Sequence, residues 1–180
     1  MTLAEQKREQ ADNVIWQPVG DATGLSIDAH LRDLVSVTGS LTRCLRDLCS
    51  GAFSLRLLGE RNEVEQGLVR EVLMLCSDLP WVFAQTVIPQ STLAGNPWIR
   101  DLGDRPLGDT LFDRPGVVRS NLNLTRLRRG HHLYDRAVRD AGLAGFPESL
   151  LARRSIVRIV DTELTINEVF LPDAGYCQPR

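Results

Sequence analysis

Lysine is almost absent from this chain: Lys7 is the only one, and the other twenty of its 21 basic residues are arginines. Because 23 acidic residues offset them, the net charge is −2, which gives no general attraction to nucleic acid or to an anionic membrane. Codon usage in the source genome is one explanation for the arginines. Arginine also holds a carboxylate through two parallel hydrogen bonds, so several of these side chains are candidates for binding an anionic ligand.

The sequence also lacks long apolar runs and phosphate-binding glycine patterns. No run of about 18 apolar residues occurs, which argues against a transmembrane helix. The opening stretch, MTLAEQKREQADN, is polar and has no signal-peptide core, so we expect a cytoplasmic protein without a membrane partner. No glycine motif matches a P-loop or a dinucleotide fold, so no nucleotide cofactor is expected.

Metal and disulfide patterns are missing as well. The four cysteines have neither C-x-x-C spacing nor a disulfide framework, and we expect them to be reduced and to act as packing residues: Cys44, Cys49, Cys76 and Cys177. His131 and His132 are adjacent and would diverge by about 100° on a helix, which disfavours a shared metal ion. We therefore expect no metal.

The pattern of elements predicts one domain over residues 14–180, after a polar lead at 1–13. Leucines at helical spacing in 28–49, with a break at Gly39-Ser40, predict two helices, and 131–142 predicts another. Six stretches predict strands: 52–58, 67–77, 80–89, 117–127, 150–160 and 162–172. Consecutive hairpins with helices before and between them indicate an α+β fold on an antiparallel sheet.

Two charged residues lie on strand faces that are otherwise apolar. Glu168 shares its face with Leu164, Ile166 and Phe170, and Arg70 shares its face with Val72, Met74 and Cys76. A buried charge costs several kcal/mol unless it is paired or serves a ligand. In one interpretation Glu168 lies on an edge strand or meets a structural arginine, and Arg70 pairs with Glu168 or Glu71. In the other, Arg70 binds a ligand carboxylate and Glu168 a hydroxyl across a small ring.

A basic cluster follows in RSNLNLTRLRRGHH, which contains Arg119, Arg126, Arg128 and Arg129. It lacks the aromatic residues on which nucleic-acid bases stack. The helix pair in 28–49 is close to charge-balanced, unlike a DNA-reading motif. We interpret the basic cluster as a solvated face or a rim that attracts small anions, and we expect no nucleic-acid partner.

Four segments in order resemble the chorismate pyruvate-lyase family over roughly Ser40 to Pro172: VREVLMLCSDLPWVFAQTVIPQSTL, RPLGDTLF, LLARRSIVRI and TELTINEVFLP. The resemblance implies a single antiparallel sheet of about six strands with helical flaps over an enclosed site. It implies a monomer that eliminates pyruvate from chorismate to give 4-hydroxybenzoate, without metal or cofactor. Whether quinone synthesis or a specialised metabolite uses the product stays open.

The same resemblance assigns site residues. The family's carboxylate-binding arginine matches Arg70, and the glutamate that binds the ring hydroxyl matches Glu168. Leu41 in GSLTR and Leu107 in Pro-Leu-Gly match positions that contact ligand mainly through the backbone. One position departs: Gln85 stands where the family's Arg-Thr-Val-Val-Pro strand has arginine. We expect this to remove a positive charge from the site, so that Gln85→Arg would tighten chorismate binding.

Two other functions fit the same fold. One is a ligand-binding domain that senses small aromatic acids, of the kind attached to bacterial regulators, although a short lead leaves little room for a DNA-binding domain. The other is a related enzyme that converts chorismate to a different hydroxybenzoate. Assay of pyruvate and of the aromatic acid separates these from a 4-hydroxybenzoate-forming lyase.

Overall fold

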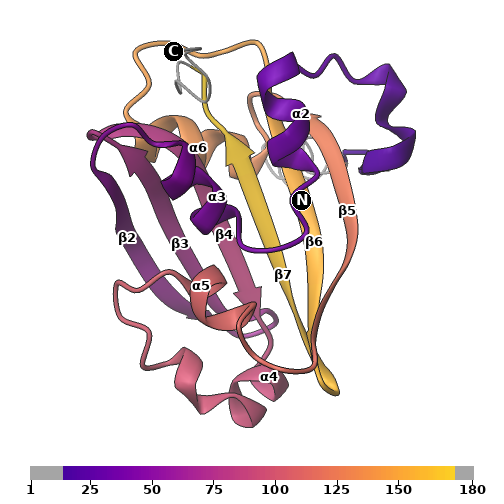
Figure 1. Cartoon of the computed structure of the whole chain (residues 1–180), viewed down its shortest axis with the longest axis vertical. Helices are drawn as coiled ribbons and strands as arrows, with labels where there is room; N and C mark the ends of the chain where they lie inside the picture. Colours follow the sequence, from indigo (N-terminus) through magenta and orange to yellow (C-terminus); the bar gives the residue numbers. More distant parts are fainter. Residues whose placement is uncertain (1–13, 173–180) are drawn as a thin grey trace, which may run out of the picture.

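The computed structural model describes residues 14–172, which fold into one sheet with short helices on both faces (Figure 1). The elements are β1 (Gln17–Pro18), the 3-10 helix η1 (Val19–Gly24), α2 (Ala29–Val35), α3 (Leu41–Leu48), β2 (Phe53–Glu63), β3 (Gly67–Cys76), β4 (Leu79–Ile88), α4 (Gln90–Gly95), the 3-10 helix η2 (Pro97–Ile99), α5 (Leu107–Leu111), β5 (Val117–Leu127), α6 (His132–Ala141), β6 (Leu150–Ile159) and β7 (Thr162–Phe170). The predicted α+β class is confirmed, and the polar lead at 1–13 lies outside the described residues.

The sheet has the order β1-β5-β6-β7-β4-β3-β2, and every neighbouring pair is antiparallel. Its six long strands include the six predicted segments, but β2 continues beyond the predicted end at 58 to Glu63, and the two-residue β1 extends the edge beside β5. β7 lies in the middle, between β6 and β4. Glu168 is therefore not on an edge strand, so one of the two structural explanations for its charge is wrong.

Tight turns join the hairpins. Ser77 and Asp78 connect β3 to β4 with φ of 48° and 65°, the positive values that a two-residue hairpin turn needs. At the other end of β3, Gly67 has φ of 85°, and a Cβ there would lie 2.3 Å from the carbonyl oxygen of Ile88. These turns fix where β3 begins and ends, and β3 carries Arg70.

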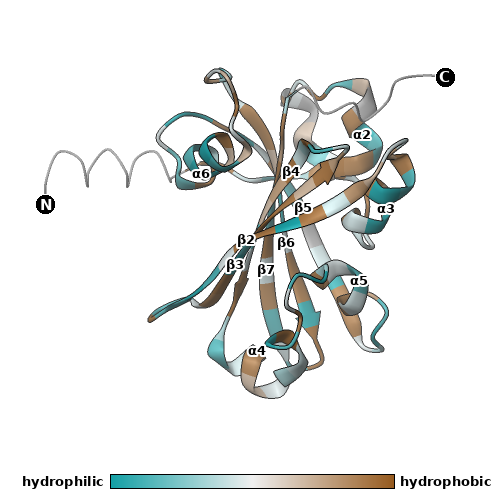
Figure 2. Ribbon diagram, turned by 90° about the vertical axis from the view of Figure 1, so that its left-hand side faces the viewer, coloured by the Kyte–Doolittle hydropathy of each residue, from teal (hydrophilic) through white to brown (hydrophobic). Residues whose placement is uncertain are grey.

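Helices cover the two faces of the sheet unequally (Figures 1 and 2). α6 packs on one face through Leu133, Tyr134, Ala137 and Val138, against buried residues of β3 and β4 such as Leu73 and Phe83. α2 and α3 cover one end of the other face, and α4, η2 and α5 cover its opposite end. Within residues 14–172, no helix has the length and apolar character needed to cross a membrane. The second face holds the pocket.

A disulfide corrects the expectation that the cysteines are reduced. Cys49, which follows α3, is bonded to Cys76, the last residue of β3, with their Cα atoms 5.7 Å apart. The two are 27 residues apart in the chain, and β2 lies between them, so their spacing gives no sign of the pairing. Cys44 is a free, half-buried thiol, and burial raises its pKa. Cys177 lies outside the described residues.

The histidine pair has a structural role at the start of α6. Nδ1 of His131 accepts a hydrogen bond of 3.2 Å from the backbone N–H of Leu133, as a helix N-cap does. The rings of His131 and His132 are stacked with their centroids 4.7 Å apart. His131 therefore caps the helix predicted in this segment.

Candidate functional site

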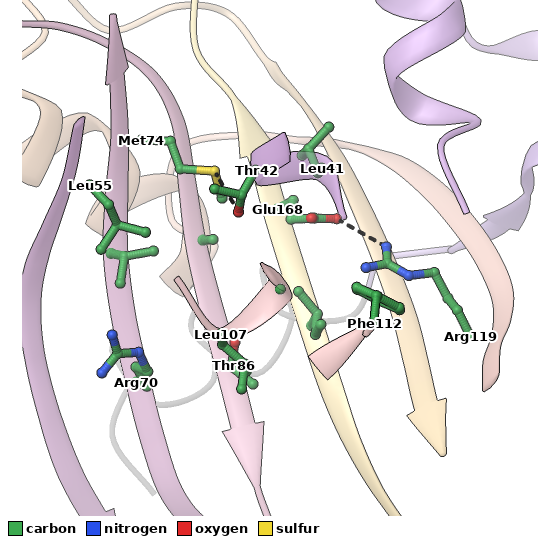
Figure 3. A pocket seen from close by; sticks show the side chains of 14 residues that line it. Leu41, Thr42, Leu55, Arg70, Met74, Thr86, Leu107, Phe112, Arg119 and Glu168 are labelled. Carbon is green, nitrogen blue, oxygen red and sulfur yellow. Dashed lines mark hydrogen bonds and ion pairs between the residues drawn. The ribbon is translucent and has the colours of Figure 1, made fainter. Parts of the chain in front are cut away.

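A pocket lies between the sheet and the helices α3 and α5, with an empty volume of about 480 Å³ that includes space open to solvent (Figure 3). Its lining is mostly apolar, with two arginines and one carboxylate: Leu41, Thr42, Leu55, Arg70, Val72, Met74, Ala84, Thr86, Leu107, Gly108, Phe112, Arg119, Ile166 and Glu168. All four site residues matched through the resemblance, from four separate elements, line this one pocket.

Leu41 and Leu107 occupy equivalent positions in the two covering helices. Leu41 is the first residue of α3, and Leu107 is the first residue of α5. The first N–H groups of a helix have no intrahelical acceptor, so backbone donors start at both pocket-lining positions. This placement agrees with contact through the backbone, which itself stays a prediction.

Polar contacts hold α3 and α5 together over the pocket. Ser40 donates to Asp109 at 2.9 Å, and its oxygen also caps α3 by accepting from the N–H of Arg43 at 3.2 Å. Arg46 pairs with Asp109 at 2.6 Å, and Arg43 pairs with Asp113 at 3.0 Å. Both arginine pairs are largely solvent-exposed, where an ion pair contributes about 0–1 kcal/mol. The two helices thus form a lid held by weak links.

Arg70 lies at one side of the pocket and is 2% exposed (Figure 3). Its Nη1 donates to Glu60, the residue opposite it on β2, and its Nη2 donates to the carbonyl of Arg105 at 3.1 Å. Arg70 therefore does not form the structural pair with Glu168 or Glu71 that the sequence allowed. Glu60 balances the charge of Arg70 while the pocket is empty. The guanidinium still lines the pocket, where a ligand carboxylate can reach it.

Glu168 lies on the other side of the pocket, where Arg153 fixes its carboxylate. Nε of Arg153 donates to Oε2 of Glu168 at 2.6 Å. The two residues lie directly opposite each other, Arg153 on β6 and Glu168 on β7. Arg153 is fully buried, and its Nη1 donates to carbonyls that end α2: those of Leu34 at 3.0 Å, Val35 at 3.4 Å and Val37 at 2.9 Å. Both arginine contacts of Glu168 use Oε2, which leaves Oε1 to accept from a ligand.

The charges around Glu168 determine its protonation state. Burial by itself would raise the pKa of this carboxyl, but the positive charges of Arg153 and Arg119, with the hydrogen bond from Arg153, outweigh it and hold the pKa below its usual range. Glu168 is therefore ionised at neutral pH. A carboxylate of low pKa is a good hydrogen-bond acceptor and a weak base.

Arg119 also lines the pocket, although the sequence pointed to it only as one member of the basic cluster. It lies on β5 beside Glu168, with 3.8 Å between its Nη1 and Oε2 of Glu168, and its guanidinium stacks 4.5 Å over the ring of Phe112. Its side chain is only 3% exposed, so the solvated-face interpretation of the basic cluster is wrong for Arg119, while Arg128 and Arg129 are exposed. No alternation marked it, because the register of β5 with β6 shifts between Ser120 and Asn123.

Gln85 lies outside the pocket, which corrects the expectation that it weakens the site. Its Nε2 donates to Glu71 at 2.9 Å, and its Oε1 accepts from Asn167 at 3.4 Å, on the face of the sheet that α6 covers. The cause is a bulge: Leu75 faces Pro80 near the turn, but Val82 faces Met74 farther along. The first register would have placed Gln85 opposite Arg70; the shifted one places it opposite Glu71.

The same opposite face holds a second charge cluster around Glu71, whose side chain is fully buried while its arginine partners are partly exposed. Its Oε2 contacts Arg61 at 2.8 Å and also Arg136 of α6. Arg61 also pairs with Glu63 at 2.7 Å, and Arg136 and Arg139 both pair with Asp140. This cluster attaches α6 to the sheet.

Comparison with known protein families gives a match over nearly the whole chain. The family model described as chorismate lyase matches residues 10–179. Several relatives carry the name probable chorismate pyruvate-lyase. The one from Dechloromonas aromatica is 37% identical over 83% of this chain and 90% of its own length. Those from Pseudoalteromonas translucida and Aromatoleum aromaticum are 36% and 35% identical, over 75% and 81% of this chain and 80% and 86% of their own lengths.

One solved structure has a weaker likeness. It is the ligand-binding domain of a GntR-family transcriptional regulator from Bordetella bronchiseptica, with 11% identity and a TM-score of 0.46, covering 67% of this chain and 86% of that one. A likeness of this degree does not bear on function.

Proposed function

This chain belongs to the chorismate lyase family, and on that premise we propose that it eliminates pyruvate from chorismate to give 4-hydroxybenzoate. The observation that carries the proposal is the arrangement of the pocket: an arginine at one side, a carboxylate with a free acceptor oxygen at the other, and apolar side chains between them. A six-membered ring with a carboxylate and a hydroxyl at opposite positions is complementary to it.

In this proposal Arg70 binds the ring carboxylate. Charge-assisted hydrogen bonds between guanidinium and carboxylate are about twice as strong as neutral ones, so Arg70 fixes that end of the ring. Oε1 of Glu168 accepts a hydrogen bond from the ring hydroxyl at the opposite end. Backbone N–H groups at Leu41 and Leu107 supply further donors from above.

The reaction breaks two bonds between ring carbons and their substituents. The proton on the carbon that bears the hydroxyl leaves, its bonding electrons complete the aromatic ring, and the neighbouring carbon–oxygen bond to the enolpyruvyl group breaks. The electron pair of that bond goes to the departing oxygen, which becomes the enol of pyruvate on protonation and then pyruvate. Aromatisation drives the elimination, so the protein's main task is to hold one conformer in a site closed to water.

Glu168 acts in this scheme by positioning. Because its pKa is held low, it is a weak base, and Arg153 keeps Oε2 occupied. The lid formed by α3 and α5 encloses the ring, and its exposed ion pairs are weak enough to break when substrate enters and product leaves.

The direct test is to incubate the purified protein with chorismate and to quantify pyruvate and the aromatic acid by chromatography. The proposal predicts equal amounts of pyruvate and 4-hydroxybenzoate. A different hydroxybenzoate would show a related enzyme. Binding of 4-hydroxybenzoate with no turnover of chorismate would replace the lyase with a ligand-binding domain.

A further inference from the structure

We propose that Arg119 binds the second carboxylate of the substrate, the one on the enolpyruvyl group. This inference rests on the proposed function, because it assumes a dianionic ligand whose ring carboxylate meets Arg70. It assigns to Arg119 the role that an arginine at position 85 would have filled. Arg119 thereby becomes a specificity-determining residue that acts on the substrate and not on the aromatic product.

The hydrogen-bonding state of Arg119 is the first support. Its side chain is 3% exposed and lines the pocket, yet its Nε and Nη1 have no hydrogen-bond partner in the described part of the chain. The 3.8 Å from Nη1 to Glu168 is an ion-pair distance and is too long for a hydrogen bond. Buried donors are nearly always satisfied in proteins, so two of them facing a pocket indicate a ligand acceptor.

The charge balance at this side of the pocket is the second support. Glu168 is one negative charge, and the two arginines beside it, Arg153 and Arg119, are two positive charges. Arg153 alone satisfies Oε2 of Glu168, so Arg119 is in excess. Burial is the main cause that lowers the pKa of Arg119 to about 10, which leaves it charged at neutral pH. A buried, uncompensated cation is costly unless an anion joins it.

The connectivity of chorismate is the third support. Its enolpyruvyl ether and its ring hydroxyl are on neighbouring carbons, whereas the ring carboxylate is across the ring from the hydroxyl. If Glu168 holds the hydroxyl, the second carboxylate lies on the Glu168 side of the pocket. Arg119 is the pocket-lining cation on that side, and Arg70 lies on the other (Figure 3). The ring of Phe112, stacked on the guanidinium, fixes its plane.

Arg153 is not an alternative for this role. Its Nη2 also has no hydrogen-bond partner among the described residues, but Arg153 is fully buried and does not line the pocket. Its Nε and Nη1 hold Glu168 and the end of α2. Arg70 is balanced by Glu60 and bonded to the carbonyl of Arg105. Among the pocket's arginines, Arg119 is thus the one with unused donors and unbalanced charge.

The test compares two stable aromatic ligands that differ by one charge. 3-Ethoxy-4-hydroxybenzoate has a neutral ether beside the hydroxyl, and 3-carboxymethoxy-4-hydroxybenzoate has a carboxylate at the end of the same ether. Calorimetry on the wild-type protein should show that the second binds more tightly. Arg119→Gln should weaken the second by about ten- to hundredfold, the effect of losing hydrogen bonds to a charged group, and change the first by less than about threefold.

Two further variants serve as matched controls. Arg136→Gln removes an arginine that contacts buried Glu71 on the opposite face and should leave the affinities for both ligands unchanged. Arg119→Lys keeps the charge and should recover part of the lost affinity for the carboxymethoxy ligand. Thermal melting checks that the variants fold. Arg119→Gln removes a buried charge and should melt no lower than wild type. If the glutamine variant does not fold, Arg119→Met replaces it.

The outcomes separate this inference from the lyase proposal. Equal weakening of both ligands in Arg119→Gln, or of neither, overturns the role of Arg119. If wild type converts chorismate and Arg119→Gln does so with unchanged kcat/KM, the role is also overturned while the lyase proposal stands. If wild type does not convert chorismate but the charge-selective loss appears, the second-carboxylate role stands and the lyase proposal fails.

Discussion

Charged residues gather on both faces of the sheet, and neighbouring residues of β3 lie on opposite faces: Arg70 faces the pocket, and Glu71 faces α6. Around Glu71 the charges balance, with three acids and three arginines: Glu63, Glu71, Asp140, Arg61, Arg136 and Arg139. Beside Glu168 one acid meets two arginines, and donors of Arg119 have no partner among the described residues. Breaking the balanced cluster is expected to destabilise the fold, whereas the unpaired donors of Arg119 beside the pocket indicate a ligand.

Glu71→Gln should have the largest effect on stability. It removes the carboxylate that Arg61 and Arg136 share, and because both arginines are partly exposed, we expect the free energy of unfolding to fall by about 1.5–3 kcal/mol. Because Glu71 lies away from the pocket, kcat/KM for chorismate should change little at a temperature where the variant is folded. Urea unfolding and steady-state kinetics measure the two effects. Stability retained with turnover lost would reverse the roles assigned to the two faces.

Arg70 should give the converse result. Arg70→Met should weaken 4-hydroxybenzoate binding by about 1.5–3 kcal/mol, the value of a hydrogen bond to a charged group, and lower kcat/KM by a similar factor. Calorimetry and kinetics measure these, and circular dichroism checks the fold. A folded variant with wild-type affinity and kinetics would make Arg70 a structural partner of Glu60 and move the carboxylate site elsewhere.

Glu168 tests how the pocket uses its unbalanced charge. If it positions the ring hydroxyl, Glu168→Gln keeps an acceptor oxygen and should retain measurable turnover, whereas loss of a general base typically removes about 10²–10⁴ in rate. Single-turnover kinetics on the folded variant decides this. A loss of about four orders of magnitude with intact substrate affinity would make Glu168 the base.

The pH dependence gives an independent check on the same residue. The pKa of Glu168 is lowered by folding, so its ionised form contributes stability above the unfolded pKa of about 4.3, and this is lost as pH falls through the lower folded value. The free energy of unfolding attributable to Glu168 should therefore be constant from pH 8 to about 5 and decline only below that. The measurement is urea unfolding of wild type and Glu168→Gln across this pH range. A decline in their difference that begins near pH 6–7 would contradict the lowered pKa.

The smallest expected effect is that of Gln85→Arg. Gln85 donates to Glu71 on the balanced face, so an arginine there adds a positive charge to a neutral cluster and none to the pocket. We expect kcat/KM for chorismate to stay within about twofold, with a lower melting temperature from like-charge repulsion. Kinetics and thermal melting measure both. Tighter chorismate binding in this variant would restore the original expectation for position 85.

Strand periodicity was enough to find part of this site. Alternation placed Arg70 and Glu168 on apolar faces, because side chains in a strand point to opposite faces with a period of two. The same rule failed for Gln85, because the face of one strand relative to another depends on register, and the bulge between Pro80 and Val82 shifts β4 by one residue. A one-residue slip moves every side chain to the other face.

Arg119 and the disulfide depended on contacts that no local pattern contains. Arg119 is buried because β5 pairs with β6 beside the central strand and α5 brings Phe112 over its guanidinium. Cys49 and Cys76 meet because the end of α3 lies next to the end of β3. The order of strands was predictable only as hairpins, since the pairing of β4 with β7 joins segments far apart in the chain.

A crystal structure of the protein with 4-hydroxybenzoate tests the central claim most directly. The account predicts the carboxylate within hydrogen-bond distance of the Arg70 guanidinium and the hydroxyl oxygen within hydrogen-bond distance of Oε1 of Glu168, with the ring beneath α3 and α5. A ligand with its carboxylate beside Arg119 and its hydroxyl toward Arg70, or bound outside this pocket, would contradict it.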